Sequence, residues 1–358
     1  MNESILDVEV YRTMGQKEFC FPKLKKKSFN RYCKIRSIAS FVPETTISND
    51  EIIEKYGLAF KSPAIIKSVG VEKRHVADEA FEDSDLLCRA AQKCLIQCGF
   101  EPDFLSRIFV NKYIGDNILP MTASKLKQKL GNKKAIQAFD IDGGISSFLI
   151  AFDLISKYIN TGDEHILLAS GGITNRMISK TDPRVAFLFG DAATAVLFSH
   201  SKDKHILASY FYSNCEFYEL SYALSPLTMA DMGLSVDLSI LYDTYRMDNW
   251  KKAEEFYRQA TIAVSNNLLE ESGLSLKEID LVLVTENNRK VWEITLETLG
   301  LNEDKSISLL KDYGNTMSAM LPLQLDMGFK QGKIVEGMNI MMISHGEGIS
   351  GGGIIYKA

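Results

Sequence analysis

The stretch FDIDGGISSFLIAF, residues 139–152, joins an apolar segment to a second apolar segment through two glycines. This order predicts a buried strand, a sharp glycine turn and the start of a buried helix. Joints of this kind often hold a nucleophile at the tip, next to the unpaired N–H groups of the helix start. The residue at the tip is Ile145, whose hydrocarbon side chain cannot act as a nucleophile.

Strand and helix patterns alternate before this joint. Ser48 is predicted to cap a helix with Glu51 three residues later. The predicted strands are 32–43, 106–113 and 135–141, and the predicted helices are 49–57, 84–99 and 121–131. Alternation of this kind implies an α/β fold with a parallel sheet covered on both faces.

The chain also repeats itself. Residues 146–172 and 316–348 share one order of parts, a helix, a glycine break and a strand that ends in glycines. Another apolar strand follows each copy, at 192–199 and at 350–358. We therefore divide the chain into an N-terminal extension and two α/β halves, at 1–32, 33–200 and 201–358.

The segment 213–250 fits neither half. It is long for a loop, and long loops are usually functional or ordered on their own. A lid, a dimer contact and an ornament of the fold are all compatible with it.

Composition excludes several classes of protein. The net charge of −5 argues against binding of nucleic acid, and the basic run KLKKK (23–27) is best explained as a solvated arm. No apolar run is long enough for a membrane helix, and the N-terminus lacks the pattern of a secretion signal, so we expect a cytoplasmic protein. We expect reduced, packed thiols rather than a metal site at Cys20, Cys33, Cys88, Cys94, Cys98 and Cys215.

Five motifs carry a resemblance to a known family. They are SVGVEKRH (68–75), AFDIDGGISSFLIAF (138–152), LFGDAATAVL (188–197), GNTMSAMLPL (314–323) and HGEGISGGG (345–353). In order and spacing, over about residues 33–358, the chain resembles the thiolase-fold condensing enzymes, and among them β-ketoacyl-ACP synthase III. The resemblance implies a duplicated α-β-α-β-α arrangement of five layers and a homodimer.

The resemblance also implies a Cys-His-Asn set around a tunnel for an acyl thioester. The cysteine at a helix N-terminus accepts the acyl group, and the other two residues support decarboxylation of a malonyl unit and stabilise the oxyanion. Carried over residue by residue, Ile145 takes the cysteine position and Thr285 takes the histidine position. Of the three catalytic residues, only the asparagine is kept, as Asn315.

Three residues are possible substitutes. Ser146 follows the tip, but one step along a helix turns its side chain by about 100°, so capping or packing competes with a nucleophilic role. His345 lies in the C-terminal glycine-rich turn and is either a base or a hydrogen-bonded turn residue. Glu286 is a general base if it is desolvated, and otherwise an exposed or ion-paired side chain.

Substrate contacts are expected nearby. Asn288 ends the run TENN, and the N–H groups of Gly346 and Gly348 lie where they would hold an oxyanion. Arg289 and Lys290 follow, where the resemblance implies contact with an acidic acyl carrier protein. We expect no resident cofactor or metal, with acyl-CoA or acyl-ACP as a possible substrate. GEGISG (346–351) spells GxGxxG, but no helix follows it, so we discount a nucleotide site.

Three functions remain open from the sequence. The chain is a non-catalytic subunit that pairs with a cysteine-bearing relative, an atypical acyltransferase that forms no acyl-enzyme, or an acyl-chain binding or regulatory protein. A homodimer and a heterodimer are both compatible with the motifs. Synthesis of a specialised acyl or polyketide metabolite fits the missing thiol better than essential fatty-acid initiation.

Overall fold

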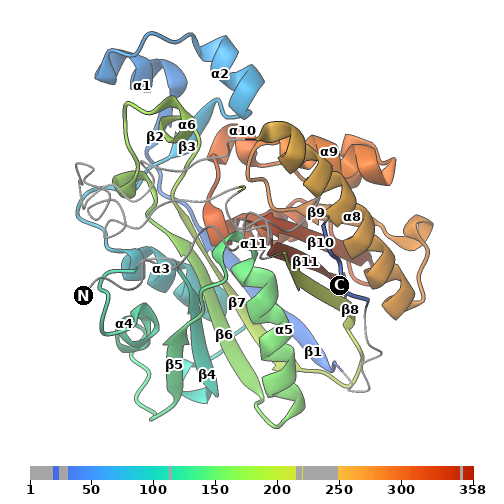
Figure 1. Cartoon of the computed structure of the whole chain (residues 1–358). Coiled ribbons are helices and arrows are strands. Elements are labelled where there is room, and N and C mark those ends of the chain that lie inside the picture. The colour runs from blue at the N-terminus through green and yellow to red at the C-terminus, as the bar shows by residue number, and fades with distance from the viewer. Residues whose placement is uncertain (1–18, 24–30, 113–114, 215–219, 221–248, 347–349) are drawn as a thin grey trace, which may run out of the picture.

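The computed structural model describes residues 19–23, 31–112, 115–214, 220, 249–346 and 350–358. Two sheets organise this part of the chain (Figure 1). In spatial order, the first sheet consists of β1 (Cys33–Phe41), β7 (Ala192–His200), β6 (His165–Gly172), β4 (Arg107–Asn111) and β5 (Gln137–Asp140). The second consists of β8 (Ile206–Ser213), β11 (Ser350–Lys357), β10 (Asn339–Gly346) and β9 (Leu281–Val284).

The second sheet repeats the pairing of the first. The outer pairs β1–β7 and β8–β11 are antiparallel, and so are the next pairs, β6–β7 and β10–β11. The pairs β4–β6 and β9–β10 are parallel. Both sheets are therefore mixed, and the expectation of a parallel sheet is correct only for part of each. We propose that this common order reflects the two halves assigned from the sequence, with β5 as an addition to the first.

Helices form the other three layers. The middle helices α5 (Ser147–Asn160) and α11 (Met320–Lys330) pack between the sheets, where their apolar residues belong to one core with residues of both sheets. The helices α3 (Asp83–Gln97) and α4 (Thr122–Lys129) cover the outer face of the first sheet, and α8 (Trp250–Ser272) and α9 (Arg289–Leu299) cover that of the second. This confirms the expected five layers.

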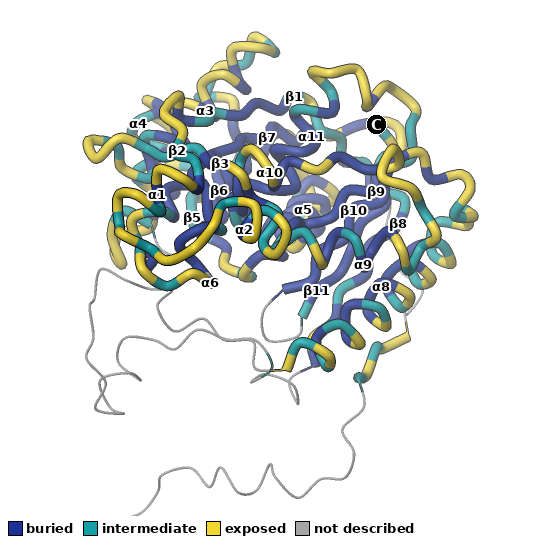
Figure 2. The backbone as a smooth tube through the Cα atoms, turned by 90° about the horizontal axis from the view of Figure 1, so that it is seen from above, coloured by how far each residue is buried: buried dark blue, intermediate teal, exposed yellow. Residues whose placement is uncertain are grey.

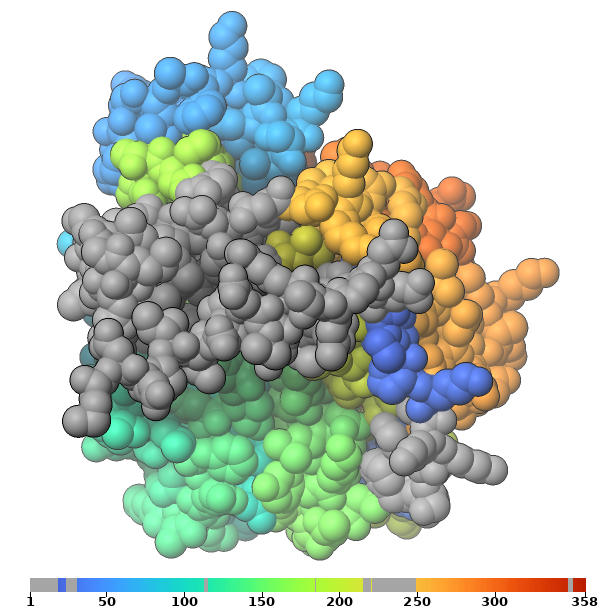
Figure 3. Space-filling model, in the orientation of Figure 1, coloured from blue at the N-terminus to red at the C-terminus, as the bar shows by residue number. Residues whose placement is uncertain are grey.

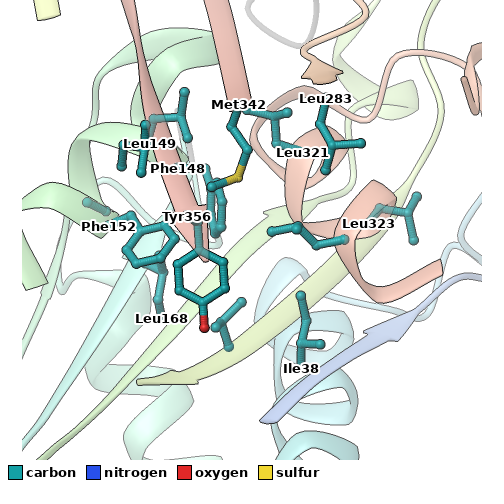
Figure 4. Packing of buried hydrophobic residues seen from close by; sticks show 14 of the residues in the cluster. Ile38, Phe148, Leu149, Phe152, Leu168, Leu283, Leu321, Leu323, Met342 and Tyr356 are labelled. Atoms are coloured by element: carbon teal, nitrogen blue, oxygen red, sulfur yellow. The ribbon is translucent and has the colours of Figure 1, made fainter. Parts of the chain in front are cut away.

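The strands of both sheets and the inward faces of the middle helices are buried, and the strands are largely dark blue in Figure 2. Figure 4 shows side chains from both middle helices and both sheets meeting there: Ile38, Phe148, Leu149, Phe152, Leu168, Leu283, Leu321, Leu323, Met342 and Tyr356. Burying one such side chain stabilises a fold by about 1.5–3 kcal/mol. The packing therefore fixes where the N-termini of α5 and α11 lie.

The helix starts partly follow the predictions. The capping box at α1 (Asn49–Tyr56) is confirmed, because Ser48 and Glu51 exchange hydrogen bonds between side chain and backbone. The predicted start of α3 at Ser84 is one residue late. Glu82 is the N-cap there, and its N–H donates to Asp85 at 3.0 Å.

The remaining short elements lie at one end of the first sheet and beside α9. The strands β2 (Thr46–Ser48) and β3 (Lys73–His75) pair with each other. The other elements are the helices α2 (Ser62–Val69), α6 (Pro183–Ala186) and α10 (Leu310–Tyr313). Figure 1 shows α1 and α2 projecting above the sheets, with α6 beneath them.

Part of the N-terminal extension packs on the second half. Residues 19–23, the dark blue patch in Figure 3, lie against α8 and β8. The ring of Phe19 is 5.3 Å from that of Phe256 in α8, and the ring of Phe21 is 5.1 Å from that of Tyr212 in β8. Arg31 is buried and binds Glu271 of α8 at 2.9 Å. Of the basic run 23–27, only the exposed Lys23 is described. Most of the segment 213–250 lies outside the described residues, so its three possible roles stay predictions.

The cysteines of the described chain are free. Cys33, Cys88 and Cys94 are buried, as expected, whereas Cys20 is exposed and Cys98 is half-buried. Burial raises the pKa of Cys94 to about 12. Cys215 lies outside the described residues. The described part of the chain contains no cluster of three His, Cys, Asp or Glu that could hold a metal ion, and no helix in it is long and apolar enough to cross a membrane.

Candidate functional site

The predicted joint is present between β5 and α5. A single 3₁₀ turn, η3 (Gly144–Ser146), leads into α5. Gly144 has a φ of 56°, in the left-handed region that favours glycine, and its N–H donates to the Asp142 carboxylate at 3.0 Å. Ile145 is therefore at the tip of the turn, and it is only 2% exposed.

Ile145 fits against the end of β10. A Cβ atom added to Gly346 would lie 2.9 Å from Cγ2 of Ile145, closer than such contacts allow. Gly346 thus leaves the space that the isoleucine methyl fills. The predicted binding of an oxyanion by the Gly346 N–H stays a prediction. Gly348, the other predicted oxyanion donor, lies outside the described residues.

The side chain of Ser146 forms a hydrogen bond with β10. Its Oγ lies 2.9 Å from Oγ of Ser344, and both residues are buried. The predicted capping bond to α5 is not formed. The hydroxyl therefore ties the start of the helix to the second sheet, which is a packing role.

Thr285 follows β9 directly, and its side chain lies on the same face of the second sheet as that of Ser344. Its N–H donates to the Ile343 carbonyl at 3.0 Å, which continues the parallel register and sets Thr285 beside Ser344. Side chains alternate between faces along a strand, so Thr285 follows Leu281 and Leu283 onto the face of the middle helices. It is 1% exposed, and its Oγ1 has no hydrogen-bond partner among the described residues.

Glu286 is desolvated, the condition under which the sequence made it a candidate base, so the alternative of an exposed side chain is wrong. No ion pair of Glu286 is found in the described part of the chain. It is fully buried and accepts hydrogen bonds from the Ser308 hydroxyl (2.5 Å), the Leu309 N–H (2.7 Å), the Leu310 N–H (3.2 Å) and the Gln324 amide (3.3 Å). Burial raises its pKa, and these donors oppose that shift. The carboxylate anchors the start of α10, so we do not retain Glu286 as a general base.

His345 lies on the opposite face of the second sheet from Ser344. Its Nε2 is 3.1 Å from the Thr261 hydroxyl of α8, and its Nδ1 is 3.1 Å from the Tyr212 hydroxyl. Thr261 donates to the Tyr257 carbonyl at 2.7 Å, so it accepts the proton of Nε2 and Tyr212 donates to Nδ1. Burial lowers the pKa of His345 to about 3. His345 is a hydrogen-bonded structural residue and not a substitute base for the tip.

Asn315 is held in place near the tip. It begins the loop into η8 (Met317–Ala319), which contacts η3. Its Oδ1 accepts the Met317 N–H at 2.8 Å, and its Nδ2 donates to the Asn287 carbonyl at 3.3 Å. The sequence analysis did not single out Asn287, whose Nδ2 donates to the His345 carbonyl at 2.6 Å. The run of polar residues that follows the buried strand β9 was the available signal.

Two family models match the chain. They are 3-oxoacyl-[acyl-carrier-protein (ACP)] synthase III over residues 139–215 and the C-terminal model of the same name over residues 269–358. β-Ketoacyl-[acyl-carrier-protein] synthase III of Neisseria meningitidis serogroup A is 28% identical over 328 residues, which cover 91% of this chain and 99% of the relative. That of Coxiella burnetii strain Dugway is 27% identical over 330 residues, with the same two shares.

Solved structures share the fold. 3-Oxoacyl-[acyl-carrier-protein] synthase III of Aquifex aeolicus superposes with a TM-score of 0.80 at 23% identity, covering 91% of this chain and 100% of that one. The priming β-ketosynthase of the R1128 polyketide pathway gives 0.81 at 21% identity, covering 94% and 99%. The chain therefore has the thiolase fold and is similar to the β-ketoacyl-ACP synthases III over most of its length.

The predicted contact residues of this synthase III-like chain have structural partners. Asn288 caps α9, since its Oδ1 accepts the Val291 N–H at 3.1 Å. Arg289 lies over the Trp292 ring, 4.2 Å from its centroid, and binds Glu293 and Glu303. Lys290 is more exposed, at 56%, and lies 3.4 Å from Glu293. Contact of Arg289 and Lys290 with a carrier stays a prediction.

The fold of a ketoacyl synthase III brings Ile145, Thr285, Asn315 and Gly346 to one region, as the resemblance implied, and it directs His345 and Glu286 elsewhere. The polar side chains described above for this region carry hydroxyl and amide groups, which can donate or accept hydrogen bonds but do not act as a base near neutral pH.

Proposed function

We propose that the chain is a non-catalytic subunit of a condensing enzyme, paired with a cysteine-bearing relative of synthase III type. One observation carries this proposal: Ile145 occupies the tip of the β5–α5 joint, buried, with its methyl group against Gly346. An acyl group has no atom there on which to form a thioester.

The surrounding residues support the same function. Ser146 is bonded to Ser344, Glu286 is saturated by four donors, and His345 faces α8. None of these three replaces the missing nucleophile or base. A chain that lost the catalytic cysteine would gain little from keeping the catalytic histidine. This would explain why the cysteine position holds Ile145 and the histidine position holds Thr285.

Co-expression tests the proposal. The chain and a cysteine-bearing relative from the same genome, each with a different tag, should co-purify and elute together as a heterodimer in size-exclusion chromatography. The condensing activity should belong to the pair and survive an Asn315→Ala change in this chain. Elution as homodimers alone, with full activity in the relative's homodimer, would rule the proposal out.

A second function is direct acyl transfer without a covalent acyl-enzyme. Asn315 is retained beside the tip, and the Thr285 hydroxyl is unpaired, so hydrogen-bond donors remain where an oxyanion would develop. Positioning and such donors can accelerate a reaction considerably without a nucleophile on the protein. Thiol release from acyl-CoA by the isolated chain, lost in Asn315→Ala, would favour this alternative.

The ligand class in both proposals is an acyl thioester, as acyl-CoA or acyl-ACP. The support is the similarity to β-ketoacyl-[acyl-carrier-protein] synthase III, whose name includes the carrier protein, and the exposed Lys290 at the start of α9. Specialised acyl or polyketide synthesis is the proposed setting. The third possibility is an acyl-chain binding or regulatory protein. In that case neither a heterodimer nor turnover of acyl thioesters is expected.

A further inference from the structure

Among the buried polar atoms that have no hydrogen-bond partner in the described part of the chain are two from the turn after β9. They are Oγ1 of Thr285 and Oδ1 of Asn287. Buried polar groups in folded proteins are nearly always paired, and exceptions point to a ligand, a water molecule or strain. The two residues belong to one turn, since the Asn287 N–H donates to the Thr285 carbonyl at 3.0 Å.

The chemical sense of Asn287 is fixed by its neighbours. Its Nδ2 lies 2.6 Å from the carbonyl oxygen of His345, which can only accept, so the amide cannot be turned round. Oδ1 is thus a pure acceptor. Asn315 is fixed in the same way, because its Oδ1 accepts the Met317 N–H.

The unpaired acceptor Oδ1 of Asn287 requires a hydrogen-bond donor on the ligand. An ester, thioester or carboxylate presents only acceptor oxygens and would leave Oδ1 of Asn287 unsatisfied. A hydroxyl or a primary amide can donate to Oδ1, and the unpaired Thr285 hydroxyl of the same turn can donate to or accept from a ligand group that reaches it.

The surroundings favour a neutral ligand with an apolar body. The one carboxylate of the turn, Glu286, has its oxygens occupied by four donors, and His345 is uncharged on the far face. Met317, whose N–H binds Asn315, packs on a small apolar cluster that contains Ile178, Val185 and Phe189. A charged group would lose its hydration there without gaining a counter-ion.

We propose that the turn Thr285–Asn287 binds a neutral apolar molecule that ends in a hydrogen-bond donor, a hydroxyl or a primary amide, in preference to the corresponding ester. The inference rests on the proposed loss of catalysis: a site that no longer holds a thioester on the protein binds a different terminal group. The molecule would be a product or effector of the pair rather than its thioester substrate.

Calorimetric titration of the full chain with octanamide and with methyl octanoate tests this proposal. We expect octanamide to bind more tightly. Thr285→Val removes one hydrogen bond to the ligand and should weaken octanamide binding about 3- to 10-fold, while ester binding changes little. Asn287→Ala should abolish the preference.

Thr295→Val is the matched control, because the Thr295 hydroxyl is buried in α9 and already donates to the Val291 carbonyl at 2.8 Å. It should leave both affinities unchanged. Equal affinity for the two probes, no heat of binding for octanamide, or a crystal structure soaked with octanamide that shows ordered water only at the turn would overturn the inference. None of these outcomes bears on the heterodimer, which the co-expression experiment tests separately.

Discussion

At the residue scale, the central observation is the match between Ile145 and Gly346. A branched side chain occupies the tip only because the facing residue has no Cβ. The two residues come from different halves of the chain, 201 positions apart, and neither a strand nor a helix pattern links them. Their fit makes the tip part of the packed core, so it should behave energetically as core.

Gly346→Ala should lower the free energy of unfolding by about 1–3 kcal/mol, because the new methyl group overlaps Cγ2 of Ile145. Ile145→Ala removes that methyl group. The two changes should therefore be non-additive, with a coupling energy of about 0.5–3 kcal/mol in a double-mutant cycle measured by urea unfolding. Strict additivity would show that the two side chains do not meet.

His345 gives the protein a pH dependence of known sign. Its pKa of about 3 in the folded chain lies below the value of about 6.5 expected when unfolded, so the unfolded chain binds the proton first as the pH falls. The contribution is complete above about pH 6.5 and is lost towards pH 3, by about 1.4 kcal/mol per pH unit.

His345→Gln keeps a polar side chain between Thr261 and Tyr212 but cannot titrate. Urea unfolding between about pH 6 and pH 4 should therefore show a slope smaller by about one proton in the variant. Carboxylates elsewhere affect both proteins alike. Identical slopes would mean that the histidine is protonated in the folded state and that its assigned hydrogen bonds are wrong.

At the element scale, the described part of the N-terminal extension packs on the second half of the chain and contacts both α8 and β8. Phe19 and Phe21 pack on Phe256 of α8, and the Tyr210 hydroxyl of β8 donates to the Pro22 carbonyl at 2.8 Å. Glu271, the partner of Arg31, also accepts the Ser209 N–H of β8. The extension thus holds the edge strand β8 to its covering helix.

Arg31→Ala should destabilise the chain by about 3–5 kcal/mol, because it leaves the largely buried carboxylate of Glu271 without its cation. Lys23→Ala, an exposed change in the same extension, should have almost no effect. Thermal unfolding of both variants checks the difference. Equal melting temperatures would show that the extension is not anchored through the Arg31–Glu271 pair.

Several elements could be predicted from the sequence because their signals are local. The glycine turn before α5 and the capping box of α1 depend on residues a few positions apart, and both are confirmed. The directions of His345 and Glu286 could not be predicted, since they depend on the register of β10 against β9 and on the start of α10. The unpaired Thr285 hydroxyl likewise becomes apparent only once its spatial neighbours are known.

At the scale of the whole molecule, two sheets of common topology clamp the middle helices, so residues at the helix N-termini meet the ends of β9 and β10. This arrangement belongs to the fold and does not depend on which side chains stand at the helix N-termini. The motifs were enough to predict it, because they recur in the same order along the chain. Partner choice depends on surfaces that no single motif records.

The central claim is that no acyl group can be held covalently at the β5–α5 joint. Intact-mass spectrometry after incubation with acyl-CoA, with a cysteine-bearing relative as the positive control, tests it most directly. We predict that the relative gains one acyl group while the mass of this chain is unchanged. An acyl adduct mapped to residues 139–152 of this chain would contradict the account.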